Sequence, residues 1–357
     1  MIYFRRPSSS VTWKLPMLWA SFLTGALILG ITAYQNVQQT TRLVSSWASG
    51  DCQASVSGAT SDADQFSMAY RESLGFFDDI PEEDWELMRN ITLGRVNNDD
   101  PINPLLRRLV APEWYQKNWD PDFSCRHDTK VGVGDGAKWV CDPHRLVRQS
   151  QKRMVQYAQE GRLTNQTAGK EIRSGCLVYS VGSNGDFRFE EGFQKLIPGA
   201  CEIHTFDFTD YSGRVPPGKN IFFHHWGLKP SYTETKATHS NRFQQVIPPN
   251  KPFKTFQETI EELGHVGRPI DVFKIDCEGC EWSTYKDWIG ADMRQILVEV
   301  HLVPPIAQDF FSDLQKAGYV TFHKEPNIQY GGGECVEYAM LKLSTEFVED
   351  RLVAKTS

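Results

Sequence analysis

The sequence has no block of basic residues interleaved with aromatic side chains and no excess of positive charge. Lys and Arg total 38 against 45 Asp and Glu, which gives a net charge of −7 with His neutral. Because neutralisation of phosphates dominates affinity for nucleic acid, no nucleic-acid partner is expected. Hydrophobic residues make up 40% of the 357 residues and charged residues 23%. This composition excludes a wholly disordered, collagen-like or coiled-coil chain.

Paired metal-binding motifs are also missing. Cys277 and Cys280 form a CxxC motif, but no second CxxC and no HxxxH accompany it, so neither a zinc site nor a thioredoxin-like redox unit is predicted. The eight cysteines suit disulfides in an oxidising compartment. The expected pair is Cys125 and Cys141, which flank a glycine-rich turn (131–136). That turn resembles a nucleotide-binding loop but follows no predicted strand.

One long apolar run is present, from Leu15 to Tyr34, and it contains no charge. About twenty residues is the length that a helix needs to cross a bilayer. Arg5, Arg6 and Lys14 precede the run, and the next cation is Arg42. The charge asymmetry predicts a single-pass type II membrane protein with a luminal C-terminus, in the Golgi or endoplasmic reticulum. A cleaved signal peptide is the alternative.

The rest of the chain divides by composition. We predict a cytosolic tail (1–14), the anchor (15–34), a flexible stem (35–65), an accessory region (66–165) and a catalytic-type domain (166–357). The sequons at Asn90 and Asn165 agree with a secretory location. Asp62 and Asp64 form the D-x-D typical of glycosyltransferases, but they lie in the stem.

An α/β fold is predicted from short apolar runs that alternate with amphipathic segments. Seven strands are expected, at 176–182, 202–207, 220–225, 270–276, 295–301, 319–324 and 335–343. Alternation of strands and helices predicts a parallel sheet, and the short last connection predicts that the final two strands form an antiparallel hairpin. A helix is expected at 145–161 with Val147, Met154 and Ala158 on its packing face. Another should begin at a capping box of Thr255 and Glu258 and end at Gly264.

Chemically useful residues follow the predicted strands. The first strand runs into a turn that contains Gly182, Ser183 and Gly185, where backbone can approach a ligand closely. The second ends at Asp207, about 25 residues after that turn, where a carboxylate that binds both ribose hydroxyls is expected. Polar residues that end the fourth and fifth strands are Asp276, Glu278, Glu299 and His301. Together they predict a nucleoside site with an acidic floor that contains a histidine.

This arrangement resembles the Rossmann-like sheet of class I S-adenosylmethionine-dependent methyltransferases. FKIDCEGCEW resembles the K-I-D-x-E-G signature of FkbM-type enzymes, and VEVHL and AGYVTFHKEPN follow in the matching order. With CLVYSVGSNGDFRFE and GDGAKWVCDP, residues 125–343 are similar to the eukaryotic membrane-anchored methyltransferase-like group. FkbM enzymes usually carry an acidic residue two positions before the first glycine, where this chain has Ser180.

The resemblance implies a methyl donor, S-adenosylmethionine, held by Gly182, Ser183, Gly185 and Asp207, with Asp276 near its methionine end. It implies O-methylation of a glycan or glycoprotein hydroxyl. Methyl transfer needs alignment and one general base, for which His301 or Asp276 is the candidate, and a strand-end carboxylate can instead hold a divalent cation.

Glu278 and Glu299 are further catalytic candidates, and both can also serve as structural partners of a cation such as Lys274. A degenerate methyltransferase fold that acts as a membrane-tethered binding module and a luminal glycosyltransferase are the alternatives. The sequence does not predict the oligomeric state.

Overall fold

The computed structural model describes residues 76–77, 79–93, 107–163, 172–218, 220–232 and 247–343. All of them belong to one compact unit, residues 62–357. The predicted anchor, the stem and the sequon at Asn165 lie outside the described residues, whereas Asn90 is exposed on a helix. Within the described part of the chain, no helix has the length and apolarity needed to cross a bilayer.

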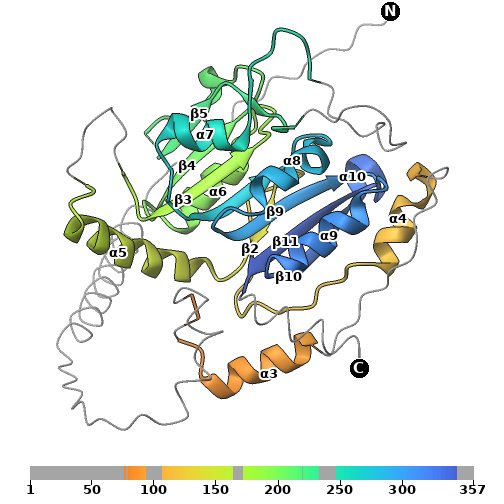
Figure 1. Ribbon diagram of the computed structural model, residues 1–357, viewed down its shortest axis with the longest axis horizontal. Coiled ribbons are helices and arrows are strands. Elements are labelled where there is room, and N and C mark those ends of the chain that lie inside the picture. Colours follow the sequence, from red (N-terminus) through yellow and green to blue (C-terminus); the bar gives the residue numbers. More distant parts are fainter. Residues whose placement is uncertain are drawn as a thin grey trace, which may run out of the picture. The chain divides into compact units, whose positions relative to one another are not determined.

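Seven strands form the central sheet, in the spatial order β10-β11-β9-β8-β3-β4-β5 (Figure 1). The strands are β3 (Cys176–Val181), β4 (Cys201–Phe206), β5 (Ile221–His224), β8 (Ile270–Ile275), β9 (Met293–His301), β10 (Tyr319–Asn327) and β11 (Cys335–Lys342). All neighbours pair in parallel except β11, which is antiparallel to β9 and β10. The predicted seven-stranded sheet and its terminal hairpin are therefore confirmed.

The strand order reverses between β3 and β8, which makes the carboxyl ends of these two strands the expected ligand site.

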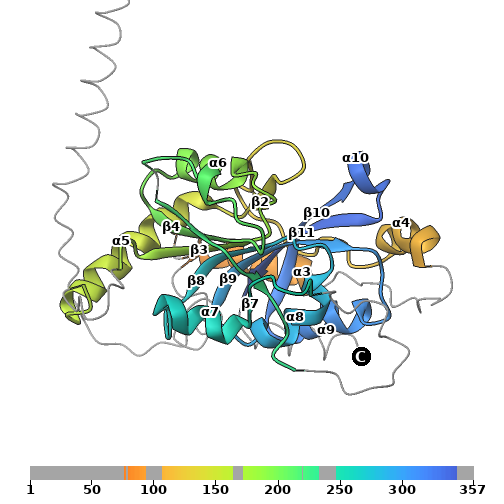
Figure 2. The ribbon, with the colours of Figure 1, turned by 90° about the horizontal axis from the view of Figure 1, so that it is seen from above.

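Helices cover both faces of the sheet (Figure 2). One face carries α5 (Pro143–Gln159) and α6 (Arg188–Leu196), and the other carries α7 (Phe256–Leu263), α8 (Cys280–Trp288) and α9 (Ala307–Lys316). The capping box of Thr255 and Glu258 begins α7, and Gly264, in the left-handed conformation, ends it as predicted. The strands between these layers are buried on both faces, which explains their nearly continuous apolar runs.

The packing face predicted for the helix at 145–161 is wrong. Ala158 is exposed and Val147 and Met154 are only partly buried; α5 instead buries Leu146, Ser150 and Tyr157. Polar contacts set this face, because the Ser150 hydroxyl donates to the Ala200 carbonyl at 2.6 Å, an interaction that apolar periodicity cannot reveal.

Residues of the predicted accessory region pack on the same unit. They include α3 (Glu82–Leu93), α4 (Arg107–Lys117) and a hairpin of β1 (Thr129–Val131) and β2 (Lys138–Val140). The predicted disulfide between Cys125 and Cys141 is confirmed. The side-chain amide of Gln295 on β9 bonds both the N–H and the C=O of Cys141, at 2.8 and 2.9 Å. These bonds hold β2 against β9 and β11.

Small elements complete the rim of the sheet. They are a turn of 3-10 helix (Ser212–Arg214), a parallel pair of β6 (Gly227–Leu228) and β7 (Phe253–Lys254), and α10 (Ile328–Gly331) between the hairpin strands. A second disulfide, between Cys176 and Cys201, joins β3 to β4 where both strands begin. Cys277 and Cys280 form a third.

Candidate cofactor and acceptor site

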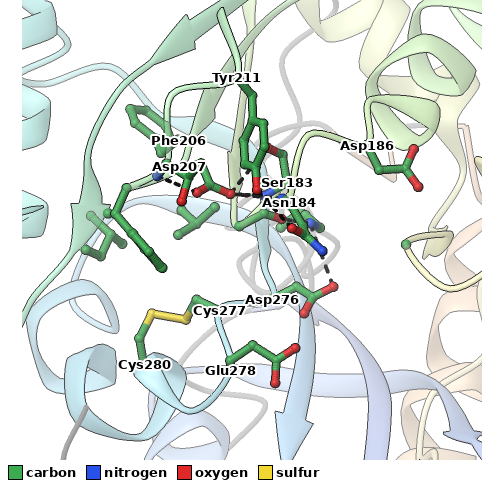
Figure 3. Close-up of a pocket in the computed structure, with 18 of the residues that line it drawn as sticks. Ser183, Asn184, Asp186, Phe206, Asp207, Tyr211, Asp276, Cys277, Glu278 and Cys280 are labelled. Atoms are coloured by element: carbon green, nitrogen blue, oxygen red, sulfur yellow. Dashed lines mark hydrogen bonds and ion pairs between the residues drawn. A yellow bond between two sulfur atoms is a disulfide. The ribbon is translucent and has the colours of Figure 1, made fainter. Parts of the chain in front are cut away.

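A cavity of about 660 Å³ opens at the carboxyl ends of β3, β4 and β8, where the strand order reverses. Its size is within the usual range for small-molecule sites. The predicted cofactor residues Gly182, Ser183, Asp207 and Asp276 all line it (Figure 3). Gly185, the remaining predicted residue, belongs to the same turn but does not line the cavity.

The turn after β3 needs glycine at two positions. Gly182 has φ +80°, and a Cβ atom there would lie 1.7 Å from the carbonyl oxygen of Asp276. Gly185 has φ +72°, and a Cβ atom there would lie 2.6 Å from the ring of Tyr211. Between them Asn184 is also left-handed, at φ 48°. Side chains at either glycine would therefore displace backbone or ring atoms that shape the cavity.

Asp207 organises this turn. One carboxylate oxygen accepts the N–H groups of Ser183 and Asn184, at 3.1 and 2.9 Å, and the other accepts the N–H of Thr209, at 2.8 Å. The residue is only 8% exposed. The sequence predicted a carboxylate that binds ribose, and the structure adds that this carboxylate already holds two loops in place. Each oxygen has two lone pairs, so acceptor capacity remains for a ligand.

Both apolar and acidic side chains line the cavity. The rings of Phe208 and Phe253 stack with centroids 5.4 Å apart, and Val181, Phe206 and Leu228 also line the cavity. Five carboxylates line the cavity against two cations. The carboxylates are Asp135, Asp186, Asp207, Asp276 and Glu278, and the cations are Arg188 and Lys274. This excess of negative charge favours a cationic ligand over a diphosphate.

All four predicted catalytic residues lie in one cluster beside the cavity. The Nε2 atom of His301 is 3.5 Å from a carboxylate oxygen of Glu278 and 4.0 Å from one of Asp276. Its ring Nδ1–H and its backbone N–H both donate to one oxygen of Glu281, at 2.9 and 3.0 Å. Only Asp276 and Glu278 of the four line the cavity, because Glu299 and His301 lie behind them.

Charge fixes the protonation state of His301. Burial alone would lower its pKa, but Glu281, Asp276 and Glu299 outweigh burial and raise the pKa to about 10. The imidazole is therefore protonated at neutral pH and donates hydrogen bonds. Burial would raise the pKa of Asp276, but Lys138, Lys274 and His301 lower it well below its usual range. The pair is an imidazolium beside a carboxylate.

Lys138 on β2 is the centre of the cluster and was not predicted. Its ammonium group, 2% exposed, lies 3.1 Å from Asp276, 3.5 Å from Glu299 and 2.5 Å from Glu337. Burial would lower the pKa of Lys138, but the three carboxylates raise it far above its usual value. Glu299 thus pairs with Lys138, and the partner considered from the sequence, Lys274, instead donates to the carbonyl of Gly182.

Other site residues also escaped the sequence analysis. Asp135 and Gly136 in the β1–β2 turn line the cavity, so the turn that was assigned to a disulfide loop also borders the ligand site. Cys277 and Cys280 line it too, as a disulfide at the start of α8. The only sequence signal for these residues was that both segments belong to motifs on which the methyltransferase resemblance rests, GDGAKWVCDP and FKIDCEGCEW.

Ser180 occupies the position where the resemblance to FkbM-type enzymes predicts an acid. It lies on β3, wholly buried, beside the equally buried Glu190 of α6. Glu190 accepts a bond from Thr205 at 3.4 Å, and burial raises its pKa although Lys274 opposes the shift. A carboxyl group from α6 therefore lies close to the place where the strand lacks one.

The fold and the site together define a class of protein, the Rossmann-like α/β proteins with a ligand cavity at the strand-order reversal. The family model that matches the chain is described as a methyltransferase domain and covers residues 67–342. Since the match covers most of the chain, the protein belongs to this family of methyltransferase domains. The match begins at residue 67, so it includes the predicted accessory region.

Solved structures and curated sequences add little to this assignment. A Methanococcus jannaschii fibrillarin pre-rRNA processing protein is 8% identical over 47% of this chain and 66% of that chain, with a TM-score of 0.30. A Burkholderia thailandensis 1,6-didemethyltoxoflavin-N1-methyltransferase, solved with S-adenosylhomocysteine, is 12% identical over 63% of this chain and 100% of that chain, with a TM-score of 0.27. The chain spans just under two thirds of the first of these. No curated protein matches it significantly.

Proposed function

We propose that the protein binds S-adenosylmethionine in the cavity and transfers its methyl group to a hydroxyl of a glycan or glycoconjugate in the secretory pathway. The observation that carries the cofactor assignment is the excess of carboxylates over cations in the lining. The donor has a sulfonium and an ammonium group, both positive, whereas the pyrophosphate of a dinucleotide is negative. Membership in a methyltransferase family supports the same choice.

The cavity residues fit the parts of this donor. Phe208, Phe253 and Leu228 offer apolar surface to the adenine. The Oδ1 atom of Asp207, which accepts one N–H group, retains a lone pair for a ribose hydroxyl. Asp276 and Glu278 offer negative charge to the methionine end and the sulfonium centre. When bound, the donor supplies an electrophilic methyl group.

Asp276 is the residue that we assign to accept a hydrogen bond from the acceptor hydroxyl and to orient it, since its strongly lowered pKa makes it a weak base. It lines the cavity, where an acceptor hydroxyl can reach it, whereas His301 does not line it. Lys138 fixes one oxygen of Asp276 from 3.1 Å, which leaves the other oxygen, on the side of His301, to hold the hydroxyl, whose proton is lost to solvent on methyl transfer. The remaining catalytic work is alignment of the hydroxyl oxygen with the methyl group, which the surrounding wall supplies.

Disulfides and the predicted anchor support the secretory location. Three disulfides in the described residues suit an oxidising lumen better than the cytosol. Glycans are abundant hydroxyl acceptors there, and the resemblance to FkbM enzymes points to the same kind of acceptor. The binding-module alternative predicts that the folded chain does not bind the donor. Membership in a methyltransferase family disfavours the glycosyltransferase alternative.

Calorimetry on the full-length chain tests the cofactor assignment through charge. S-adenosylmethionine should bind more tightly than uncharged-sulfur S-adenosylhomocysteine, and NAD⁺ should not bind. Asp186→Asn removes one lining carboxylate and should reduce the difference in affinity between the two sulfur ligands. Asp309 is an exposed acid on α9, and Asp309→Asn should leave this difference unchanged. Tighter binding of NAD⁺ than of either sulfur ligand would refute the assignment.

Transfer of labelled methyl groups tests the acceptor. The full-length chain is incubated with labelled donor and a panel of glycans and glycoproteins, with Asp276→Asn as the matched variant. Base-stable label on glycans, lost in the variant, supports O-methylation. Label on protein amines or carboxylates would refute the sugar hydroxyl but keep the methyltransferase. Absence of both labelled product and donor binding, in a folded sample, would favour the binding module.

A further inference from the structure

The CxxC motif of Cys277 and Cys280 is a disulfide in the wall of the cofactor cavity (Figure 3). Cys277 follows β8, and Cys280 is the first residue of α8. Between them lies Glu278, whose side chain also lines the cavity. Cys277 is partly buried, whereas Cys280 is wholly buried. The sulfur of Cys277 is therefore the one that a small thiol entering from the cavity meets first.

This disulfide closes the shortest loop of the three in the described residues. Its cysteines are 3 positions apart in sequence, against 16 for Cys125 and Cys141 and 25 for Cys176 and Cys201. A cross-link stabilises a fold mainly by restricting the unfolded chain, and it does so less when the loop is short. The bond between Cys277 and Cys280 therefore contributes least to stability, and its reduction should leave the fold intact.

The backbone inside the loop is left-handed at two consecutive residues. Glu278 has φ 57° and Gly279 has φ 105°. Glycine adopts this conformation freely, but a residue with a Cβ atom does so at a cost and needs its surroundings to hold it there. The disulfide supplies this constraint, because it joins the residues on either side. It thereby fixes the direction of a carboxylate that faces the ligand.

Glu281 connects the disulfide to the charged cluster beside the cavity. One oxygen of this wholly buried carboxylate accepts the N–H of Gly279 at 3.0 Å and lies 3.5 Å from the Sγ atom of Cys277. A disulfide sulfur has no proton to donate, whereas a thiol has one, so the reduced form gains a hydrogen bond to Glu281. The other oxygen accepts both N–H groups of His301. A change at Cys277 therefore reaches the cluster through one side chain.

We propose that the disulfide between Cys277 and Cys280 is a reversible redox switch that controls binding of the methyl donor, with a low-molecular-weight thiol as the reductant. This regulation rests on the donor binding proposed above. The disulfide form holds Glu278 toward the donor. Reduction frees the loop, lets Glu278 leave its left-handed conformation and weakens donor binding.

The chemistry is ordinary thiol–disulfide exchange. The thiolate of the reductant attacks the Sγ atom of Cys277 and breaks the S–S bond, which releases Cys280 as a thiolate at the N-terminus of α8. Backbone N–H groups at a helix N-terminus stabilise negative charge on a cysteine. A second thiol then attacks the mixed disulfide and releases Cys277. Two electrons and two protons pass to the protein, which gains two thiols, and the reductant leaves as its own disulfide.

Calorimetry tests the switch on the full-length chain, equilibrated with either oxidised or reduced glutathione. S-adenosylmethionine should bind the reduced chain at least about tenfold more weakly. The double variant Cys277→Ser/Cys280→Ser should bind as weakly as the reduced wild type in both buffers, which separates this disulfide from the other two. Absence of binding to the oxidised wild type would refute the proposed function, whereas equal affinity in the two buffers would overturn the switch alone.

Alkylation followed by mass spectrometry gives an answer from the wild-type chain, without any variant that has to fold. In graded glutathione redox buffers, thiols should appear at Cys277 and Cys280 before they appear at the other disulfides. Saturating donor should lower the midpoint potential by about 30 mV for each tenfold difference in affinity, because the donor favours the oxidised form. Earlier reduction of another disulfide, or a midpoint that the donor does not move, would overturn the proposal.

Discussion

Replacement of His301 by asparagine should remove a pH-dependent part of the stability. In the wild type, the ring and backbone N–H groups of His301 both donate to the wholly buried carboxylate of Glu281. The amide of asparagine can keep the hydrogen bond but carries no titrating charge. The substitution therefore removes the charge of His301 while it keeps the hydrogen bond to Glu281.

The size of the effect follows from the pKa of His301. The carboxylates overcome burial and raise this pKa from 6.5 to about 10 in the folded state. A raised pKa means that the folded protein holds the proton more tightly, so the stabilisation is fully present below pH 6.5 and is lost as pH rises toward 10. Between pH 6 and pH 9 the wild type should lose about 3 kcal/mol that the variant does not lose.

Urea denaturation followed by tryptophan fluorescence, at pH 6 and at pH 9, measures this difference. The free energies of unfolding of wild type and His301→Asn should converge as pH rises. His225→Asn, which changes an exposed histidine, should follow the wild type at both values. If wild type and His301→Asn lost the same free energy of unfolding between pH 6 and pH 9, the neighbouring carboxylates would not stabilise the protonated His301. The description of the cluster would then be wrong.

Three further substitutions test other parts of the site. Gly182→Ala should destabilise the protein by about 2–5 kcal/mol, because the residue is left-handed and its new Cβ would meet the carbonyl of Asp276; unchanged urea stability would contradict the turn geometry. Asp207→Asn should lower the free energy of unfolding by about 1.5–3 kcal/mol, since an amide has only one oxygen that can accept hydrogen bonds. Loss of donor binding at an unchanged free energy of unfolding would mean that the carboxylate serves the ligand alone. Lys138→Met should lower the free energy of unfolding by about 3–5 kcal/mol, because the buried Glu299 and Glu337 and the partly buried Asp276 lose the cation between them. A smaller loss would indicate that those groups are neutral.

Much of the fold could be predicted because its signals are local. Each buried strand is a short apolar run, and the capping box of Thr255 and Glu258 is four residues long. The residues that end the strands were found because parallel strands bring their carboxyl ends to one edge of the sheet. Local pattern and topology were sufficient to place Asp207, Asp276 and His301 at that edge.

The missed features depend on contacts between distant segments. Lys138 is 138 residues from Asp276 and 199 from Glu337 in sequence, and a lone lysine that follows a glycine-rich turn gives no sign of burial. The disulfide between Cys176 and Cys201 joins the starts of two strands whose pairing the cysteine spacing does not reveal. The buried face of α5 depends on polar contacts such as the hydrogen bond from Ser150 to the carbonyl of Ala200, which a search for apolar periodicity overlooks.

The most direct test of the account is hydrogen–deuterium exchange on the full-length chain with and without S-adenosylmethionine. The donor should protect the three loops at the carboxyl ends of β3, β4 and β8, in peptides that contain Ser183, Thr209 and Glu278. Helix α9 should exchange as before, because none of its residues lines the cavity. Protection elsewhere, or none at a saturating donor concentration, would contradict the central claim that this cavity holds the methyl donor.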